Sequence, residues 1–256
     1  MRVMIEYSGK GKILIKVLVL SFVFNVGLLL TLAYVSYIKT DFGYRVLSKT
    51  GLLDYNHVDY RHNIEYRCLE GWANSLYKQH IEADVVFYGN SITYESDFQK
   101  FFPKLQVVNL GCNRDDLDDL IHRSFVICRV RPRKIFVLGG INRLMDITIE
   151  EFRSKYDILV DTIKRQNPNA QLFLQSILPV NVEMELGERY VDSIDKLKQA
   201  NLVIKEIAVR KQCTFVDLYS IYQVQGSLPR RYTRDGIHLC ADAYSIWAQV
   251  IRKYLD

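Results

Sequence analysis

A serine directly after a short apolar run is the first residue of this 256-residue sequence that could perform nucleophilic chemistry. Residues 84–89 (DVVFYG) have the pattern of a buried strand, and Ser91 follows in Gly89-Asn90-Ser91. A serine at a strand-to-helix turn is exposed, and a helix that begins there favours negative charge developing on a substrate. Serine is also a common helix N-cap, so this residue alone indicates no activity.

A carboxylate and a histidine three positions apart, Asp235 and His238, form the second candidate group. With Gly236 between them, the chain can turn so that the carboxylate accepts a hydrogen bond from the ring Nδ1–H. That bond would fix the imidazole tautomer and leave Nε2 free as a base. The same spacing also occurs where a turn precedes a helix cap, so the pair alone is a weak signal.

Short apolar runs alternate with helical patterns from residue 83 onward, which is typical of βαβ units and a parallel sheet. The expected fold is α/β, a flavodoxin-like three-layer α/β/α sandwich with a five-stranded parallel sheet. In such sheets the binding and catalytic residues lie beyond the carboxyl ends of the strands. We predict strands at 84–89, 106–111, 134–140, 171–178 and 214–219, and helices near 115–129, 148–166, 190–210 and 241–254. A capping box is predicted to start the second of these helices, at Thr148 and Glu151.

Four segments in chain order resemble the sequence blocks of the SGNH (GDSL-like) hydrolases, over about residues 83–256. VVFYGNSIT resembles the nucleophile block, VVNLGCNRDD the second block, VLGGIN the G-x-N-D block, and DGIHLCADAYSIWA the closing D-x-x-H block. Each motif is weak by itself. Their order, with each beyond a predicted strand, makes the joint signal strong.

The resemblance implies a carboxylic ester hydrolase that forms an acyl-enzyme on Ser91. His238 would act as base and then as acid, while Asp235 orients the histidine. The resemblance also implies an oxyanion hole made by the main-chain amides of Ser91 and Arg114 and the side chain of Asn142. No metal ion and no organic cofactor is expected.

Three positions depart from the family's pattern. Asn90 replaces the Asp of G-D-S, which is a mild change because that residue positions others and does not react. Arg114 stands where a glycine normally provides the second-block amide, and a position that requires positive φ would strain an arginine. Arg143 replaces the Asp of G-x-N-D. None of the three removes the triad, so we expect an active enzyme.

Arginines near the predicted site suggest a substrate that carries acid groups. Five guanidinium groups facing one cleft would attract carboxylates or phosphates. The alternative is that they turn outward or pair with nearby carboxylates, namely Asp115, Asp116 and Asp146. The arginines lie in two family blocks and in the loop before the triad's carboxylate: Arg114, Arg143, Arg230, Arg231 and Arg234.

The net charge of +5 does not indicate nucleic-acid binding, because residues 1–38 hold four basic residues against one acidic residue. No nucleic-acid-binding motif accompanies the rest of the chain. The acidic cluster at 115–119 falls in the first turn of a predicted helix, where carboxylates suit the helix dipole, so we expect no metal there. The five cysteines show no metal-ligand spacing, and we expect small buried residues.

An uncharged apolar run at 17–38 is long enough to cross a hydrocarbon core as a helix. We expect an uncleaved transmembrane anchor, because a signal peptide has a shorter apolar region and a buried core helix has a polar face. Residues 1–16 would be a cytoplasmic tail, 39–82 a connecting region with an amphipathic helix around 63–80, and 83–256 the hydrolase domain. This single-pass topology places the domain in the periplasm or outside the cell.

We therefore expect a membrane-tethered esterase that removes small acyl groups, above all O-acetyl, from a cell-envelope glycan. The ester chemistry follows from the motif set, and the glycan preference follows from the family resemblance and the envelope placement. Three alternatives stay open: a lysophospholipase or thioesterase, an acyltransferase with the same triad, and a non-catalytic domain that binds glycan or a membrane partner. The oligomeric state also stays open.

Overall fold

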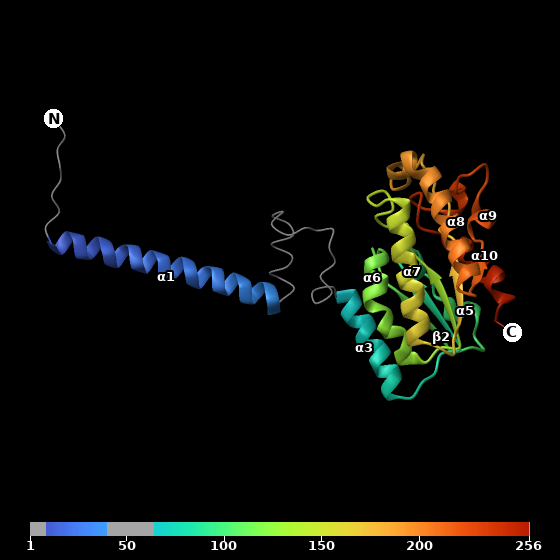
Figure 1. The fold of residues 1–256 in the computed structure, drawn as a ribbon, viewed down its shortest axis with the longest axis horizontal. Coiled ribbons are helices and arrows are strands. Elements are labelled where there is room, and N and C mark those ends of the chain that lie inside the picture. Colours follow the sequence, from blue (N-terminus) through green and yellow to red (C-terminus); the bar gives the residue numbers. More distant parts are fainter. Residues whose placement is uncertain (1–8, 40–63, 256) are drawn as a thin grey trace. The chain divides into compact units, whose positions relative to one another are not determined.

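The computed structural model describes residues 9–39 and 64–255 (Figure 1). The predicted tail at 1–16 and the predicted connecting region at 39–82 therefore lie partly outside the described residues. The chain divides into two compact units, Met1–Arg67 and Cys68–Asp256.

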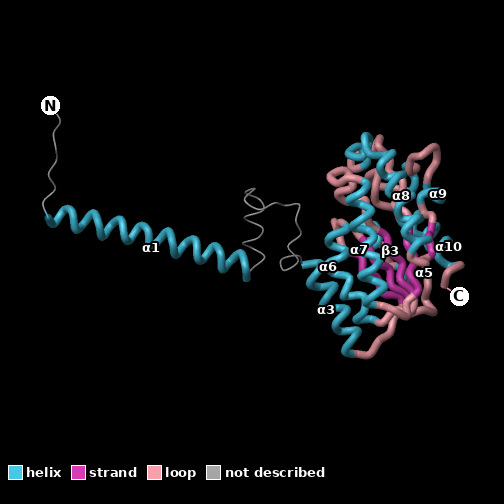
Figure 2. Tube along the Cα trace, viewed as in Figure 1, coloured by secondary structure: helices cyan, strands magenta, loops and turns pink. Residues whose placement is uncertain are grey.

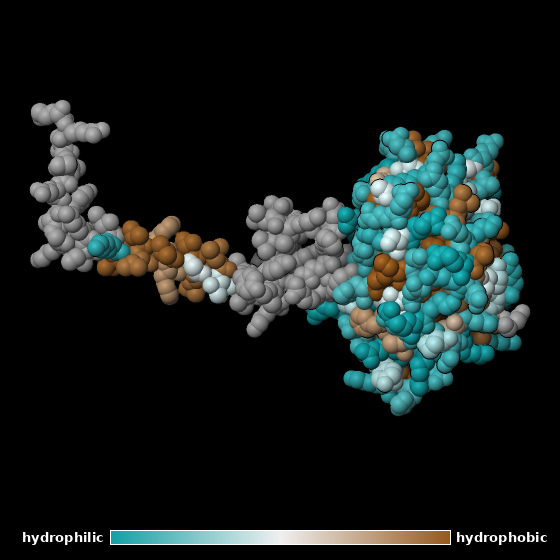
Figure 3. Space-filling model, in the orientation of Figure 1, coloured by the Kyte–Doolittle hydropathy of each residue, from teal (hydrophilic) through white to brown (hydrophobic). Residues whose placement is uncertain are grey.

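The first unit contains a long helix, α1 (Gly9–Lys39), over the stretch predicted as an anchor. Its described side chains, at 16–32, are exposed and mostly apolar (Figure 3). Asn25 Nδ2 donates to the Ser21 carbonyl oxygen at 2.7 Å, so this amide bonds to its own helix. Within the described residues, no helix is long and apolar enough to cross a membrane, so the predicted transmembrane helix is not supported.

A five-stranded parallel sheet forms the centre of the second unit, as predicted (Figure 2). Every strand falls within its predicted range. The first four are nearly continuous apolar runs that are largely buried, and the fifth is a short edge strand whose first residue is exposed. The strand order is β2-β1-β3-β4-β5, and each neighbouring pair is parallel, which is the flavodoxin-like order. The strands are β1 (Val85–Gly89), β2 (Val107–Gly111), β3 (Lys134–Leu138), β4 (Gln171–Gln175) and β5 (Thr214–Val216).

Helices cover both faces of the sheet, with α6 and α7 on one side and α5 and α10 on the other (Figures 1 and 2). The α-helices of this unit are α3 (Ile64–Lys78), α4 (Ser91–Tyr94), α5 (Phe98–Phe101), α6 (Leu117–Arg123), α7 (Ile149–Gln166), α8 (Ile194–Arg210), α9 (Tyr219–Tyr222) and α10 (Ala241–Arg252). The predicted helix at 115–129 is divided into α6 and a 3₁₀ helix, and the one at 190–210 begins as a 3₁₀ turn. Sequence reasoning missed α4, α5 and α9, since four residues are too few for a helical period.

Three phenylalanines in register cover the face that lies under α5 and α10. Phe87, Phe136 and Phe173 pair across β1, β3 and β4, and successive rings stack with centroids 5.3 Å and 4.3 Å apart. Phe98 of α5 stacks on Phe87 at 3.7 Å, and Trp247 of α10 meets Phe98 edge-on at 5.1 Å. This continuous aromatic layer fixes α10, the C-terminal helix, on the sheet.

The acidic cluster serves as a helix cap. Asp116 and Asp119 complete a capping box at α6, in which each carboxylate accepts from the other's main-chain N–H at 3.0 Å. At α7, Thr148 Oγ1 accepts from Glu151 N at 3.1 Å, as predicted. The Glu151 carboxylate instead pairs with Lys155 at 3.1 Å, so the predicted box at this helix is only half formed.

The second unit begins upstream of the predicted boundary at residue 83. Ala73 and Leu76 of α3 are buried in its core, so this helix belongs to the folded unit. The prediction that the cysteines are small buried residues holds for one of them and in part for three others. All five thiols are free, and of these Cys112 is buried, Cys68 is exposed and the others are half-buried.

Candidate active site

Three strand ends that carry predicted site residues lie side by side. β1 lies between β2 and β3, and its last residue, Gly89, pairs with the last residues of both neighbours. Ser91 follows β1 closely, while Arg114 follows β2 and Asn142 follows β3. The chain order reverses at β1, which is the position where flavodoxin-like sheets bind ligands. The sheet topology therefore brings the serine and both other predicted oxyanion groups to one edge.

The turn after β1 presents the Ser91 hydroxyl. Asn90 is buried and caps α4, and its Oδ1 accepts from Ile92 N at 3.1 Å. Asparagine at this position therefore does the positioning work expected of the family's aspartate. Tyr244 of α10 donates from its hydroxyl to the Ile92 carbonyl oxygen at 2.7 Å. The C-terminal helix thus holds the short helix on which Ser91 lies.

The structure brings Ser91, His238 and Asp235 together. Ser91 Oγ lies 2.9 Å from His238 Nε2, and His238 Nδ1 lies 2.7 Å from Asp235 Oδ2. The other carboxylate oxygen, Oδ1, accepts from the amides of Ile237 at 3.0 Å and of His238 at 2.8 Å. Since the carboxylate accepts from Nδ1–H, Nε2 is left as the acceptor for the serine hydroxyl.

The pKa of Asp235 lies below its ordinary value. Burial raises this pKa, but the amide hydrogen bonds from His238 and Ile237 and the contact with the His238 side chain outweigh burial. The carboxylate therefore stays ionised at neutral pH, as a group that orients and stabilises an imidazolium requires.

Two polar residues that sequence reasoning missed hold the loop that carries His238. Thr233 Oγ1 donates to the His238 carbonyl oxygen at 2.8 Å and accepts from Gly236 N at 2.9 Å. The Gly236 carbonyl oxygen accepts from Asn181 N at 2.9 Å, so the segment after β4 docks onto this loop. Gly236 has φ +98°, and a Cβ there would lie 2.7 Å from the Asn181 carbonyl oxygen. The glycine of Asp-Gly-Ile-His is therefore required both by conformation and by space.

The predicted oxyanion positions differ in how they are held. Arg114 has φ +66°, so the position does adopt the left-handed conformation that we expected to strain an arginine, and Arg143 has φ +58°. Such a conformation in a residue other than glycine costs of order 1–3 kcal/mol. Asn142 Nδ2 donates to the Asp115 carbonyl oxygen at 2.8 Å. A side-chain amide carries two N–H groups, so this bond orients the amide and leaves a second donor.

The arginines do not form an uncompensated positive cleft. Ion pairs join Arg143 with Asp116 and Asp146, Arg230 with Glu183, and Arg234 with Glu95 and Asp235. Arg231 lies over the ring of Tyr232 at 4.6 Å. Of the carboxylates named in the alternative, Asp116 and Asp146 pair with Arg143, while Arg230 and Arg234 pair with other carboxylates. The expectation of an acidic substrate stays a prediction.

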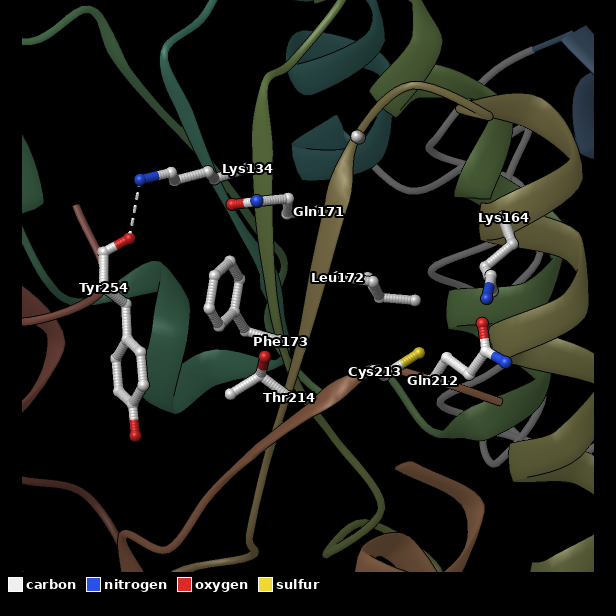
Figure 4. A pocket seen from close by; sticks show the side chains of 10 residues that line it. Lys134, Lys164, Gln171, Leu172, Phe173, Gln212, Cys213, Thr214 and Tyr254 are labelled. Atoms are coloured by element: carbon white, nitrogen blue, oxygen red, sulfur yellow. Dashed lines mark hydrogen bonds between the residues drawn. The ribbon is translucent and has the colours of Figure 1, made fainter. Parts of the chain in front are cut away.

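A pocket of about 480 Å³ lies at the opposite edge of the sheet (Figure 4). Lys134, Gln171 and Thr214, the first residues of β3, β4 and β5, line it. Lys134 Nζ donates to the Tyr254 carbonyl oxygen at 2.8 Å, and Lys164 Nζ donates to a main-chain carbonyl as well. Ser91, Asp235 and His238 are not among the residues that line it. We therefore place the reaction at the carboxyl edge.

Comparison with known proteins agrees with this assignment of the fold. The family model of the GDSL-like lipase/acylhydrolase family matches residues 87–246. The chain belongs to this family, and its activity is that of a hydrolase acting on esters. No curated protein sequence matches it.

Solved structures share this architecture. A protein from Streptococcus pneumonia named for platelet activating factor is 26% identical, with a TM-score of 0.66, and the match covers 75% of this chain and 93% of that one. A GDSL-like lipase from Bacteroides thetaiotaomicron is 20% identical, with a TM-score of 0.64 and coverage of 77% and 97%. A lipase/acylhydrolase from Enterococcus faecalis is 18% identical, with a TM-score of 0.58 and coverage of 67% and 94%. The last two matches establish the fold alone.

Gly236→Ala should damage both the stability and the activity of the enzyme, because its Cβ would collide with Asn181 and a positive φ disfavours alanine. We expect a loss of roughly 1–3 kcal/mol in the free energy of unfolding. kcat should fall at least about tenfold, since the loop carries both Asp235 and His238. Urea unfolding and nitrophenyl acetate hydrolysis measure the two effects. Gly226→Ala is the matched control, because Gly226 also has positive φ, +83°, but an added Cβ there meets nothing within 4 Å.

Proposed function

We propose that this chain is a serine esterase that removes small acyl groups, above all O-acetyl, from a cell-envelope glycan. The observation that carries the chemistry is the continuous contact from Ser91 Oγ through His238 to Asp235, at 2.9 Å and 2.7 Å. A nucleophile, a base and an orienting group in hydrogen-bond contact are the requirements for covalent acyl transfer.

The reaction proceeds in two halves. Ser91 Oγ attacks the ester carbonyl carbon while His238 Nε2 takes the hydroxyl proton, and the imidazolium then gives that proton to the departing alcohol. In the second half His238 takes a proton from water as the water attacks the acyl-serine. The imidazolium returns this proton to Ser91 Oγ as the Oγ–acyl bond breaks, and the carboxylic acid leaves. Asp235 stays ionised and stabilises the imidazolium in both halves. The amides of Ser91 and Arg114 and the Asn142 side chain stabilise the oxyanion, each by roughly 2.7–4 kcal/mol.

Three of the connections that follow strands at the reacting edge are short, which supports a small acyl group. β1 passes directly into α4, and residues 112–116 and 139–148 join β2 to α6 and β3 to α7. These three connections contain no long apolar insertion that could line a channel for a fatty acyl chain. The choice of a glycan depends on the family resemblance and on placement at the cell envelope.

Placement at the envelope depends on α1. The apolar side chains at 17–32 are exposed in the structure, and burial in lipid would remove them from water. Asn25 and Thr31 donate to main-chain carbonyls of the same helix, which satisfies these polar groups as a lipid environment requires. Basic residues before the apolar run favour an N-terminus that stays in the cytoplasm, and the proposal therefore has the esterase unit in the periplasm or outside the cell.

Ser91→Ala and His238→Ala should each lower kcat on nitrophenyl acetate by about 10⁶-fold, and Asp235→Asn by about 10⁴-fold. The nucleophile and base are needed for covalent chemistry, whereas the orienting group is partly dispensable. Burst and steady-state kinetics measure both, and Ser75→Ala on α3 serves as the control that should keep full activity. Near-normal turnover by the Ser91→Ala protein would rule out Ser91 as the nucleophile. Absence of any ester hydrolysis by the unaltered protein would replace this proposal with a binding domain.

Acetyl esters should be cleaved with at least about tenfold higher kcat/KM than octanoyl esters, because the short connections provide no channel for a long chain. A series of nitrophenyl esters from acetyl to decanoyl measures this preference. A maximum at octanoyl or beyond would make the enzyme a lysophospholipase or thioesterase. Faster acyl transfer to an added sugar alcohol than to water would make it an acyltransferase.

The full-length protein should stay in the membrane fraction after a carbonate wash, because α1 would be buried in lipid. A variant that lacks residues 1–39 should be released into the soluble fraction. Protease added to intact spheroplasts should digest the esterase unit. Release of the full-length protein by carbonate would refute the anchor, and protection from protease would reverse the topology.

A further inference from the structure

Arg123 is the last residue of α6, and its side chain is completely buried, with 0% exposure. Its guanidinium lies over the ring of Tyr88, with 4.3 Å between the central carbon and the ring centroid. All three nitrogens find acceptors within the protein. Nε contacts the Asp115 carboxylate, Nη1 donates to the Leu110 carbonyl oxygen at 2.8 Å, and Nη2 donates to that of Gly89 at 2.8 Å.

Two of these acceptors are the strand ends that deliver predicted site residues. Gly89 ends β1 immediately before the Asn90-Ser91 turn, and its carbonyl oxygen also accepts from Cys112 N at 3.0 Å. Leu110 is the second-last residue of β2, and the segment that contains Arg114 follows this strand. A guanidinium is planar and rigid, so one group that bonds to both carbonyls fixes the separation of the two strand ends.

The third acceptor connects the guanidinium with Asn142. The Asp115 carboxylate pairs with Arg123, while the main-chain carbonyl of Asp115 accepts from Asn142 Nδ2 at 2.8 Å. A single buried residue therefore joins Arg123 to the side-chain amide that we assign to the oxyanion hole. Arg123 is therefore linked to the segments of Ser91 and Arg114 through the Gly89 and Leu110 carbonyls, and to Asn142 through Asp115.

We propose that Arg123 and Asp115 are positioning residues for the oxyanion hole. Arg123 holds the strand ends before Ser91 and Arg114 at a fixed separation, and Asp115 aims the Asn142 amide. This inference rests on the proposed esterase function. A buried ion pair adds little net stability compared with apolar residues of similar volume. A role in the geometry of the site accounts for such a pair better than a role in stability does.

Paired substitutions separate positioning from stability. Arg123→Met keeps the approximate volume but leaves Asp115 buried without its partner, and burial raises the pKa of that carboxyl, so it becomes neutral at a cost to folding. The double variant Arg123→Met with Asp115→Asn removes both charges and keeps the main-chain carbonyl that binds Asn142. We expect its unfolding midpoint to return close to that of the unaltered protein. Its kcat on nitrophenyl acetate should stay about 10²-fold low, with KM changed less than about threefold.

The affinity for a tetrahedral inhibitor separates the two roles, because a purely structural role of Arg123 would leave that affinity unchanged. Methylboronic acid forms a tetrahedral adduct with the serine, and its affinity should fall in parallel with kcat/KM, whereas competitive inhibition by acetate should be unaltered. Arg123→Lys keeps the charge without the planar geometry and should show an intermediate loss of kcat. Phe173→Leu, in the aromatic layer on the other face, is the control that loses stability at unchanged kcat.

Recovery of kcat together with the unfolding midpoint in the double variant would overturn the positioning role. Unchanged boronate affinity would overturn it as well. If the unaltered enzyme shows no Ser91-dependent hydrolysis, the proposed esterase function fails, and this inference fails with it. An active unaltered enzyme with an equally active double variant overturns the inference alone.

Discussion

The parallel pairing of β1 with both β2 and β3 is the constraint on which the site depends. Parallel strands end at the same edge of the sheet, so the three segments that follow them begin side by side. The strands have five residues each, and their ends are held by main-chain pairing and by Arg123 rather than by long loops. His238 has a different origin, because it follows β5 and must reach back across the edge. Its position is set by side-chain and loop hydrogen bonds, from Thr233 and from the segment at Asn181.

Features that depend on near neighbours in the chain could be predicted from the sequence. The five strands were found because apolar runs bounded by polar residues have few alternatives to a buried strand. The cap at Thr148 was found because it needs only one residue and its own helix. Positive φ at Arg114 was anticipated as a condition, because the resembled family has a glycine there, and the structure meets it. Ser91, Asp235 and His238 belong to short motifs, so their chemical types were visible before any distance was known.

Features that depend on distant residues could not be predicted. Arg123 bonds to a carbonyl 34 residues away, and nothing in the helical pattern of LDDLIHR distinguishes it from a surface arginine. The ion pair of Arg234 with Glu95 joins residues 139 apart, so this partner of a predicted substrate ligand could not be read from the sequence. The burial of the cysteines was predicted from the average burial of this residue type, but the packing around each one sets its actual exposure. The packing of α3 against the core was not predicted, because it depends on residues far along the chain.

The hydrogen bond between Tyr244 and Ile92 has a consequence for biosynthesis. It joins residues 152 positions apart, and Ser91 is separated from its base by 147 positions. At roughly 5–20 residues per second, a ribosome needs roughly 7–30 s to make the intervening chain. Throughout that interval the serine has no partner to deprotonate it, and a free hydroxyl is a weak nucleophile. The nascent polypeptide is therefore inert toward acylated metabolites in the cytoplasm, and reactivity arises only when translation has delivered the last helix.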